Sequence, residues 1–209
     1  LQAVLNNAMA SPNVIGVNSG AGFFALLAAA LAPEVPGAAQ FVSFLGALGC
    51  AMLVYALARL TGLSRTTLVL SGLAVSGMFS AGMNIIRLLW PESVSSAPSF
   101  LVGGLSGATL KMLLLALPYL FTGSILAFWI DTDLNVLCLG DETASGLGLH
   151  VETIRFIGIL AAALLAGAAV SFAGLLSFVG LLAPHIARKI VGNDHRVLLP
   201  SSALLGAFC

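Results

Sequence analysis

The feature that most restricts the fold of this chain is a run of 32 residues, 156–187, that contains no Asp, Glu, Lys or Arg. A helix needs about 20 largely apolar residues to cross a bilayer, so this run is too long for one upright crossing. Counted from 153 to 191, it can hold two short spans joined by a tight turn near Ser171–Gly174. The sequence therefore predicts a helical hairpin within a membrane.

Charge-free stretches of span length recur elsewhere, at 16–32, 39–58, 66–86 and 112–130, and a further apolar run starts near Val197. Charged residues make up only 8% of the 209 residues, against roughly 25% in soluble domains. A soluble fold could not cover its surface with so few charges. We therefore expect an all-α, multi-pass membrane protein whose residues 1–209 form a single transmembrane domain, truncated at both ends. The zero net charge gives no indication of a nucleic-acid partner.

The positions of Lys and Arg predict which ends of the helices face the cytoplasm, because basic residues are retained on that side. If 66–86 runs outward, only Arg87 and Lys111 lie outside. The other six basic residues then lie inside: Arg59, Arg65, Arg155, Arg188, Lys189 and Arg196. This bias requires 153–191 to cross twice, since Arg155 and Arg188 must share a side.

The same orientation makes 131–152 the longest cytoplasmic loop and places 87–111 outside, where Pro and Gly leave room only for a short surface helix. The inner loop is rich in leucine and is predicted to form two short helices, broken at Gly140 and again around Gly146–Gly148. Its leucines either pack the loop on its own membrane domain or anchor it to a cytoplasmic partner.

The span at 66–86 carries small and polar residues at intervals of four, namely Gly72, Ser76, Ser80 and Asn84. This spacing puts them on one face of a helix. Small residues allow membrane helices to approach closely, which explains Gly and Ser but explains Asn84 poorly. The stripe is therefore either a packing face or the wall of a translocation pathway.

No Asp or Glu lies inside a predicted span, whereas ion-coupled carriers usually need a buried ionisable group. This absence argues against the main alternative function, an ion-coupled secondary transporter. The cysteines, Cys50, Cys138 and Cys209, have no metal-ligand spacing. We expect no metal site and no cofactor bound by this chain.

An intramembrane serine protease is the other alternative, because Gly16–Gly20 resembles a Gly-x-Ser-Gly motif with one residue too many. His185 could serve as the base for Ser19, provided that the two lie within hydrogen-bond reach. The spacing disfavours this pairing, and we expect no catalytic residue. A lone histidine such as His185 is more often a packed or interfacial residue, and the sequence assigns no role to His150 or His195.

Four segments together resemble a known family, the iron-siderophore and cobalamin (FecCD-type) ABC importer permeases. They are SPNVIGVNSGAG (11–22), LSGLAVSG (70–77), LNVLCLGDETASGLGL (134–149), and LSFVGLLAPHIAR with the following GNDHRVLLPSSALLGA (176–207). The last is the most specific, because it combines Pro-His, the Asp-His-Arg turn and Leu-Pro. The resemblance covers essentially the whole chain.

This resemblance implies a ten-helix permease fold, of which the chain would run from the end of helix 2 to the start of helix 9. It implies a subunit of the bacterial inner membrane that pairs with a second permease subunit, as a homodimer or close heterodimer. Two cytoplasmic ATPase subunits, which use ATP and Mg, would dock below, and a periplasmic substrate-binding protein would deliver a ferric siderophore, haem or cobalamin. The permease itself would be non-catalytic and embedded in membrane lipid.

The resemblance also implies roles for particular residues. The helix at 66–86 would line the translocation pathway with Gly72, Ser76, Ser80 and Asn84, and the turn before it would form the cytoplasmic gate with Ser64, Arg65 and Thr66. From the residues themselves we expect the loop 131–152 to couple ATP hydrolysis to transport, because a permease without an ion-coupling residue must receive work from outside and only this inner loop is long enough to form a docking surface. Its expected contact residues are Leu137, Leu139, Gly140, Asp141, Glu142, Gly146, Leu147 and Gly148.

Overall fold

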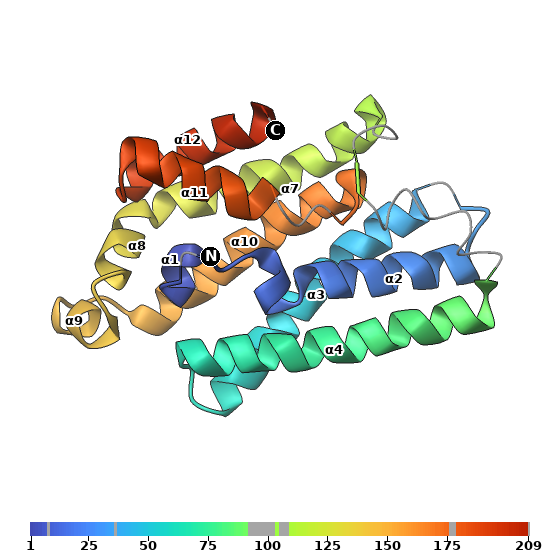
Figure 1. The fold of residues 1–209 in the computed structure, drawn as a ribbon, viewed down its shortest axis with the longest axis horizontal. Helices are drawn as coiled ribbons and strands as arrows, with labels where there is room; N and C mark the ends of the chain where they lie inside the picture. Colours follow the sequence, from blue (N-terminus) through green and yellow to red (C-terminus); the bar gives the residue numbers. More distant parts are fainter. Residues whose placement is uncertain (8, 36, 92–102, 105–108, 176–178, 209) are drawn as a thin grey trace.

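The structure is a computed structural model that describes residues 1–209 except 8, 36, 92–102, 105–108, 176–178 and 209. Its described residues form helices joined by turns, and no strand occurs among them (Figure 1). In chain order the elements are α1 (Gln2–Leu5), the 3-10 helix η1 (Pro12–Ile15), α2 (Val17–Leu31), α3 (Ala38–Leu60), α4 (Arg65–Leu89), α7 (Leu110–Trp129), α8 (Asp131–Leu137), α9 (Asp141–Gly146), α10 (Val151–Ala173), α11 (Val179–Val191) and α12 (His195–Phe208).

Each predicted span coincides with a helix. Four of these helices, α3, α4, α7 and α10, are long and apolar enough to cross a membrane, and α2 is a shorter apolar helix. The charge-free run 156–187 is divided between α10 and α11, as its length requires. The turn near Ser171–Gly174 is confirmed, because α10 ends at Ala173 and Gly174 follows with φ 71°. The predicted surface helix within 87–111 falls largely outside the described residues.

The helix ends that carry the six basic residues gather at one end of the bundle, on the left of Figure 1. There α3 ends, α4 begins, α10 begins, and α11 is followed by α12, with α8 and α9 projecting beside them. Arg87 and Lys111 belong to the opposite ends of α4 and α7. The predicted separation of six basic residues from two is therefore realised in the fold. We refer to the end of the bundle that carries the six basic residues as the basic end.

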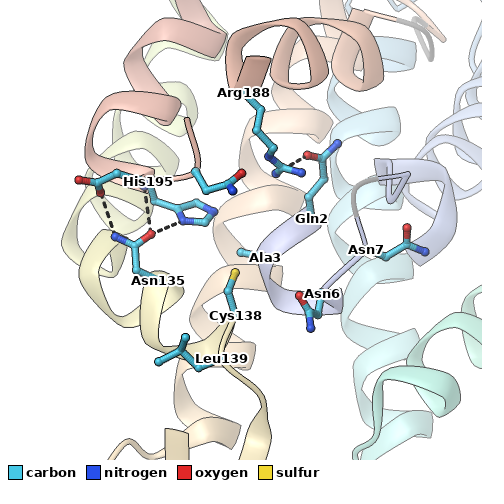
Figure 2. Close-up of a pocket in the computed structure, with 11 residues that line it drawn as sticks. Gln2, Ala3, Asn6, Asn7, Asn135, Cys138, Leu139, Arg188 and His195 are labelled. Atoms are coloured by element: carbon cyan, nitrogen blue, oxygen red, sulfur yellow. Dashed lines mark hydrogen bonds between the residues drawn. The ribbon is translucent and has the colours of Figure 1, made fainter. Parts of the chain in front are cut away.

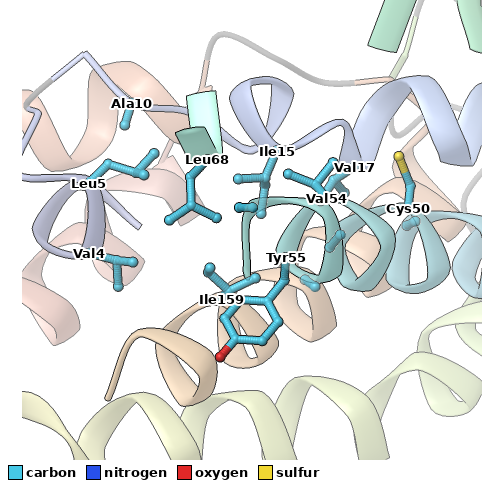
Figure 3. Close-up of a cluster of buried hydrophobic side chains, with 14 of the residues drawn as sticks. Val4, Leu5, Ala10, Ile15, Val17, Cys50, Val54, Tyr55, Leu68 and Ile159 are labelled. Atoms are coloured by element: carbon cyan, nitrogen blue, oxygen red, sulfur yellow. The ribbon is translucent and has the colours of Figure 1, made fainter. Parts of the chain in front are cut away.

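The largest core cluster joins the N-terminal segment to α3, α4 and α10 (Figure 3). Its members include Val4, Ile15, Val54, Leu68 and Ile159, all completely buried. Close approach is possible because the packed helices carry glycine: a Cβ at Gly158 would lie 2.5 Å from a methyl group of Val4. This packing holds α4 and α10 against the N-terminal segment and fixes where their basic ends lie.

Candidate functional site

The loop 131–152 forms two short helices, as predicted, with α8 and α9 separated at Gly140. Gly140 has φ 112° and ψ 156°, a region of backbone conformation that is essentially restricted to glycine. A second left-handed glycine, Gly148 with φ 86°, follows α9. Asp141 and Glu142 occupy the first turn of α9, where a helix N-terminus favours negative charge. We call 131–152 the coupling loop, after the role predicted for it from the sequence.

The leucines of the coupling loop point in two different directions. Leu137 is 0% exposed and belongs to the main core cluster, so its side chain packs within its own subunit, and nothing in the structure supports its predicted contact with a cytoplasmic partner. The apolar side chain packs the loop on its own membrane domain, as Leu134 also does. Leu139 and Leu147 are 63% and 65% exposed. These two leucines are free to contact another protein.

The turn before α4 is built around a helix cap. Ser64 Oγ accepts a hydrogen bond from Thr67 N (3.1 Å), and Ser64 N donates to Thr67 Oγ1 (3.0 Å). This reciprocal arrangement satisfies two backbone donors at the start of the helix. Among the three residues predicted for the gate, Ser64 therefore caps α4, Arg65 begins it, and Thr66 is exposed.

Asp141 connects the coupling loop to this turn. Its Oδ1 accepts from Arg65 Nη2 at 2.9 Å, and its Oδ2 accepts from Arg155 Nη2 at 2.6 Å. Arg155 also donates through Nη1 to the carbonyl of Leu63 (2.8 Å), and Arg65 reaches the carbonyl of Leu137 (3.5 Å). One carboxylate thus holds two arginines from α4 and α10. We call Asp141, Arg65 and Arg155 the Asp141 cluster.

The electrostatics of the cluster keep Asp141 ionised. Partial burial opposes ionisation, but the hydrogen bond and charge of Arg155, and then those of Arg65, outweigh it and hold the pKa of this carboxyl below its ordinary value. Arg155 is only 2% exposed, and a buried guanidinium requires a compensating partner. Asp141 supplies that partner.

A second polar network ties α8 to the turn between α11 and α12 (Figure 2). Asn135 Nδ2 donates to Asp194 Oδ1 at 2.9 Å, and Asn135 Oδ1 accepts from the backbone N–H of His195 at 3.1 Å. The His195 ring faces the same oxygen through Nδ1. Since that oxygen can only accept, Nδ1 carries the proton. Arg196 adds a bond to Thr132 Oγ1 (3.2 Å).

Beside this network lies a polar pocket of about 660 Å³ (Figure 2). It is lined by Gln2, Ala3, Asn6, Asn7, Asn135, Cys138, Leu139, Arg188, Asn193, Asp194 and His195. Gln2 Oε1 accepts from Arg188 Nη2 at 2.9 Å, which joins α1 to α11. Burial raises the pKa of the Cys138 thiol, so the thiol is neutral at physiological pH. Five of the eleven lining residues carry side-chain amides, and the pocket also has one guanidinium, from Arg188, and one carboxylate, from Asp194.

Comparisons with known proteins show the family to which this chain belongs. The family model described as the FecCD transport family matches residues 1–209. The chain belongs to the FecCD transport family. It is 38% identical to the Fe(3+)-citrate import system permease protein YfmE of Bacillus subtilis, an alignment that covers 99% of this chain and 62% of that protein. It is 40% identical to the cobalamin import system permease protein BtuC of Halobacterium salinarum, over 99% of this chain and 56% of that protein.

The fold of this FecCD family chain also matches a solved structure, described as an inward-facing conformation of a metal-chelate type ABC transporter. The TM-score is 0.89 at 28% identity, with 99% of this chain and 67% of that chain covered. The chain thus has the ABC permease fold and is a multi-pass membrane protein. It spans 62% and 56% of the lengths of the two relatives named above.

The polar stripe of α4 in this FecCD chain lies partly against its own subunit. Gly72 is buried on η1, where an added Cβ would overlap the carbonyl oxygen of Val14. For Gly72 the structure supports the packing interpretation, and nothing in it supports a place in the pathway. Ser76 and Ser80 are half-buried, while Asn84 is exposed and accepts from Arg87 (3.4 Å). A pathway role stays a prediction for these three residues.

The face of α4 opposite its buried residues is uncovered by the described residues, and its exposed side chains include Leu70, Leu73, Met78 and Ile85. Ala74, Gly77 and Ala81 lie among them and are also exposed. Leu70 is 60% exposed and Met78 is 74% exposed. This face is therefore free to contact lipid or another subunit.

Two groups of residues in these networks were not predicted from the sequence. Arg155 entered only as an orientation signal, although a basic residue near the start of an apolar helix needs a nearby partner. That requirement was a usable signal. The bonds of Asn135 to Asp194 and His195 left no such signal, because the residues are 59 and 60 positions apart. Ser19 and His185 form no hydrogen bond with each other in the described part of the chain, so nothing supports the protease pairing.

Proposed function

We propose that this chain is the transmembrane permease subunit of an ATP-driven importer that carries a ferric siderophore, or a related large metal chelate, across the bacterial inner membrane. One observation carries the proposal: the coupling loop exposes Leu139 and Leu147 while Asp141 binds the turn that begins α4. A loop of this kind can receive mechanical work from a cytoplasmic protein and deliver it to a membrane helix.

The partners follow from the same architecture. Cytoplasmic ATPase subunits contact the exposed side of the coupling loop and contain the ATP and Mg, so this chain performs no hydrolysis. A second permease subunit covers the free face of α4, and the translocation pathway runs between the two subunits. A periplasmic binding protein delivers the ligand at the end opposite the basic end. The names of the relatives, which refer to Fe(3+)-citrate and cobalamin import, support a chelate as cargo.

The test measures uptake of a radiolabelled ferric siderophore, added to the medium, by cells that contain the full-length protein and its partner subunits. One arm dissipates the proton gradient with an uncoupler while ATP is maintained, and the other depletes ATP while the gradient is kept. We expect uptake to follow ATP and to be insensitive to the uncoupler. Uptake that collapses with the gradient at constant ATP would establish the ion-coupled alternative instead.

A further inference from the structure

The starting observation is where the two arginines of the Asp141 cluster lie in their helices. Arg65 is the first residue of α4, and Arg155 lies in the first turns of α10, so both mark the basic ends of long membrane helices. Asp141 is the first residue of α9. Each carboxylate oxygen is bound by a different helix, at 2.9 Å and 2.6 Å. The contact is therefore a bridge between α4, α9 and α10.

The second observation is that α9 has little other attachment to the membrane domain. Ala144 is the only buried residue of its helix, and the side chains at 142, 143 and 145–147 are exposed. Hydrogen bonds between ionised groups are about twice as strong as those between neutral groups. The polar contact of Asp141 is consequently the main connection through which a displacement of α9 can reach α4.

The third observation is that the bridge also includes the backbone of the turn before α4. Arg155 donates to the Leu63 carbonyl, and Thr67 Oγ1 donates to the Gly62 carbonyl at 2.9 Å. The capping box of Ser64 fixes the same turn to the first turn of α4. A force on Asp141 therefore acts on a turn that is rigidly joined to its helix.

We propose that Asp141 is the positioning residue that transmits movement of the coupling loop to the cytoplasmic end of α4, through Arg65, while Arg155 holds the carboxylate in place. The inference rests on the proposed function, because it assumes that an ATPase moves the loop. It adds the route by which that movement reaches the membrane helix. Leu139 and Leu147 contact the ATPase, and the Asp141–Arg65 contact transmits the movement of the loop to α4.

The clearest test is Arg65→Gln in the full-length permease, assembled with its ATPase and reconstituted in liposomes. This change breaks the contact with α4 but leaves the buried Arg155–Asp141 pair intact. We expect the ATPase to co-purify in normal amount, while the number of ligand molecules transported per ATP hydrolysed falls about tenfold, within the usual range of coupling between sites. Arg65→Lys should restore most of the ratio.

Arg59→Gln is the matched control, because Arg59 is an exposed basic residue in the last turn of α3, with no ion pair or side-chain hydrogen bond among the described residues. This control should leave the transport ratio unchanged. A normal ratio in Arg65→Gln would overturn the inference. An equal fall in the number of ligand molecules transported per ATP in Arg65→Gln and Arg59→Gln would also overturn it, since the effect would then be one of surface charge.

Asp141→Asn gives an independent measurement through a double-mutant cycle. If the two residues act through one contact, the Arg65→Gln/Asp141→Asn pair should be no worse than the more impaired single variant. Additive losses would contradict transmission through this contact. The proposed function is tested separately by measuring how much ATPase co-purifies with Leu139→Asp and with Leu147→Asp. We expect co-purification to be lost in both variants. Normal co-purification in those two variants would refute docking through Leu139 and Leu147, and the result of the Arg65–Asp141 double-mutant cycle would be unaffected.

Discussion

Gly140 sets the direction of the coupling loop through its backbone. Its φ of 112° and ψ of 156° bring Asp141 to the arginines, and no atom lies within 4 Å of the position that a Cβ would take. Any cost of substitution at this position is therefore conformational and not steric. Gly146 offers the comparison, because it lies within α9 and its added Cβ would also meet open space.

Gly140→Ala is expected to lower the stability of the full-length protein by about 1–3 kcal/mol, the cost of holding a side chain in a region reserved for glycine. Gly146→Ala should be neutral or stabilising by up to about 1 kcal/mol, since alanine favours a helix more than glycine does. Thermal unfolding in detergent measures both, and Gly140→Val should behave like Gly140→Ala. Equal unfolding temperatures for the two alanine variants would show that the loop tolerates another backbone path.

At the scale of the element, α4 has two faces with different neighbours. Gly72 packs on the backbone of η1, and a Cβ at Gly82 would lie 2.6 Å from the ring of Phe23. Gly77 belongs to the uncovered face, and nothing lies within 4 Å of its Cβ position. The four-residue stripe in the sequence identified a face of the helix, but the residue types could not tell whether that face contacts the same subunit or the pathway.

Gly72→Ala is expected to destabilise the protein by about 1–3 kcal/mol, because the backbone of η1 must shift to admit the methyl group. Gly77→Ala is the matched control in the same helix and should not lower the unfolding temperature measured for the isolated subunit. If Gly72→Ala unfolds like the control, the close approach of α4 to η1 is not maintained in the membrane.

At the scale of the whole molecule, the spans, the division of 153–191 into two helices and the gathering of the basic ends could all be predicted from the sequence. These features depend on hydropathy and on charge counts, which are local properties. The need of Arg155 for a partner could be predicted, but the identity of that partner could not, because Asp141 lies 14 positions from Arg155 and 76 positions from Arg65. The burial of Leu137 could not be predicted either, since tertiary contacts decide whether a leucine in a loop packs inward or outward.

The orientation can be tested by cysteine labelling of the full-length protein after Cys50, Cys138 and Cys209 are replaced. Glu34→Cys lies in the exposed turn between α2 and α3, and Asn193→Cys lies in the exposed turn before α12. A reagent that cannot cross the membrane should label Glu34→Cys in intact cells and should label Asn193→Cys only after the membrane is opened. The reverse pattern would invert the orientation and place the coupling loop outside.

Contact between the coupling loop and the ATPase is tested most directly by photo-cross-linking on the assembled, full-length complex. A thiol-reactive benzophenone is attached at Leu139→Cys, at Leu147→Cys or, as the buried control, at Leu137→Cys in the same cysteine-free background. We expect the probes at 139 and 147 to cross-link the cytoplasmic ATPase on illumination, whereas the control at 137 should not. Absence of the ATPase from the products at both exposed positions would contradict the claim that this loop receives the work of ATP hydrolysis.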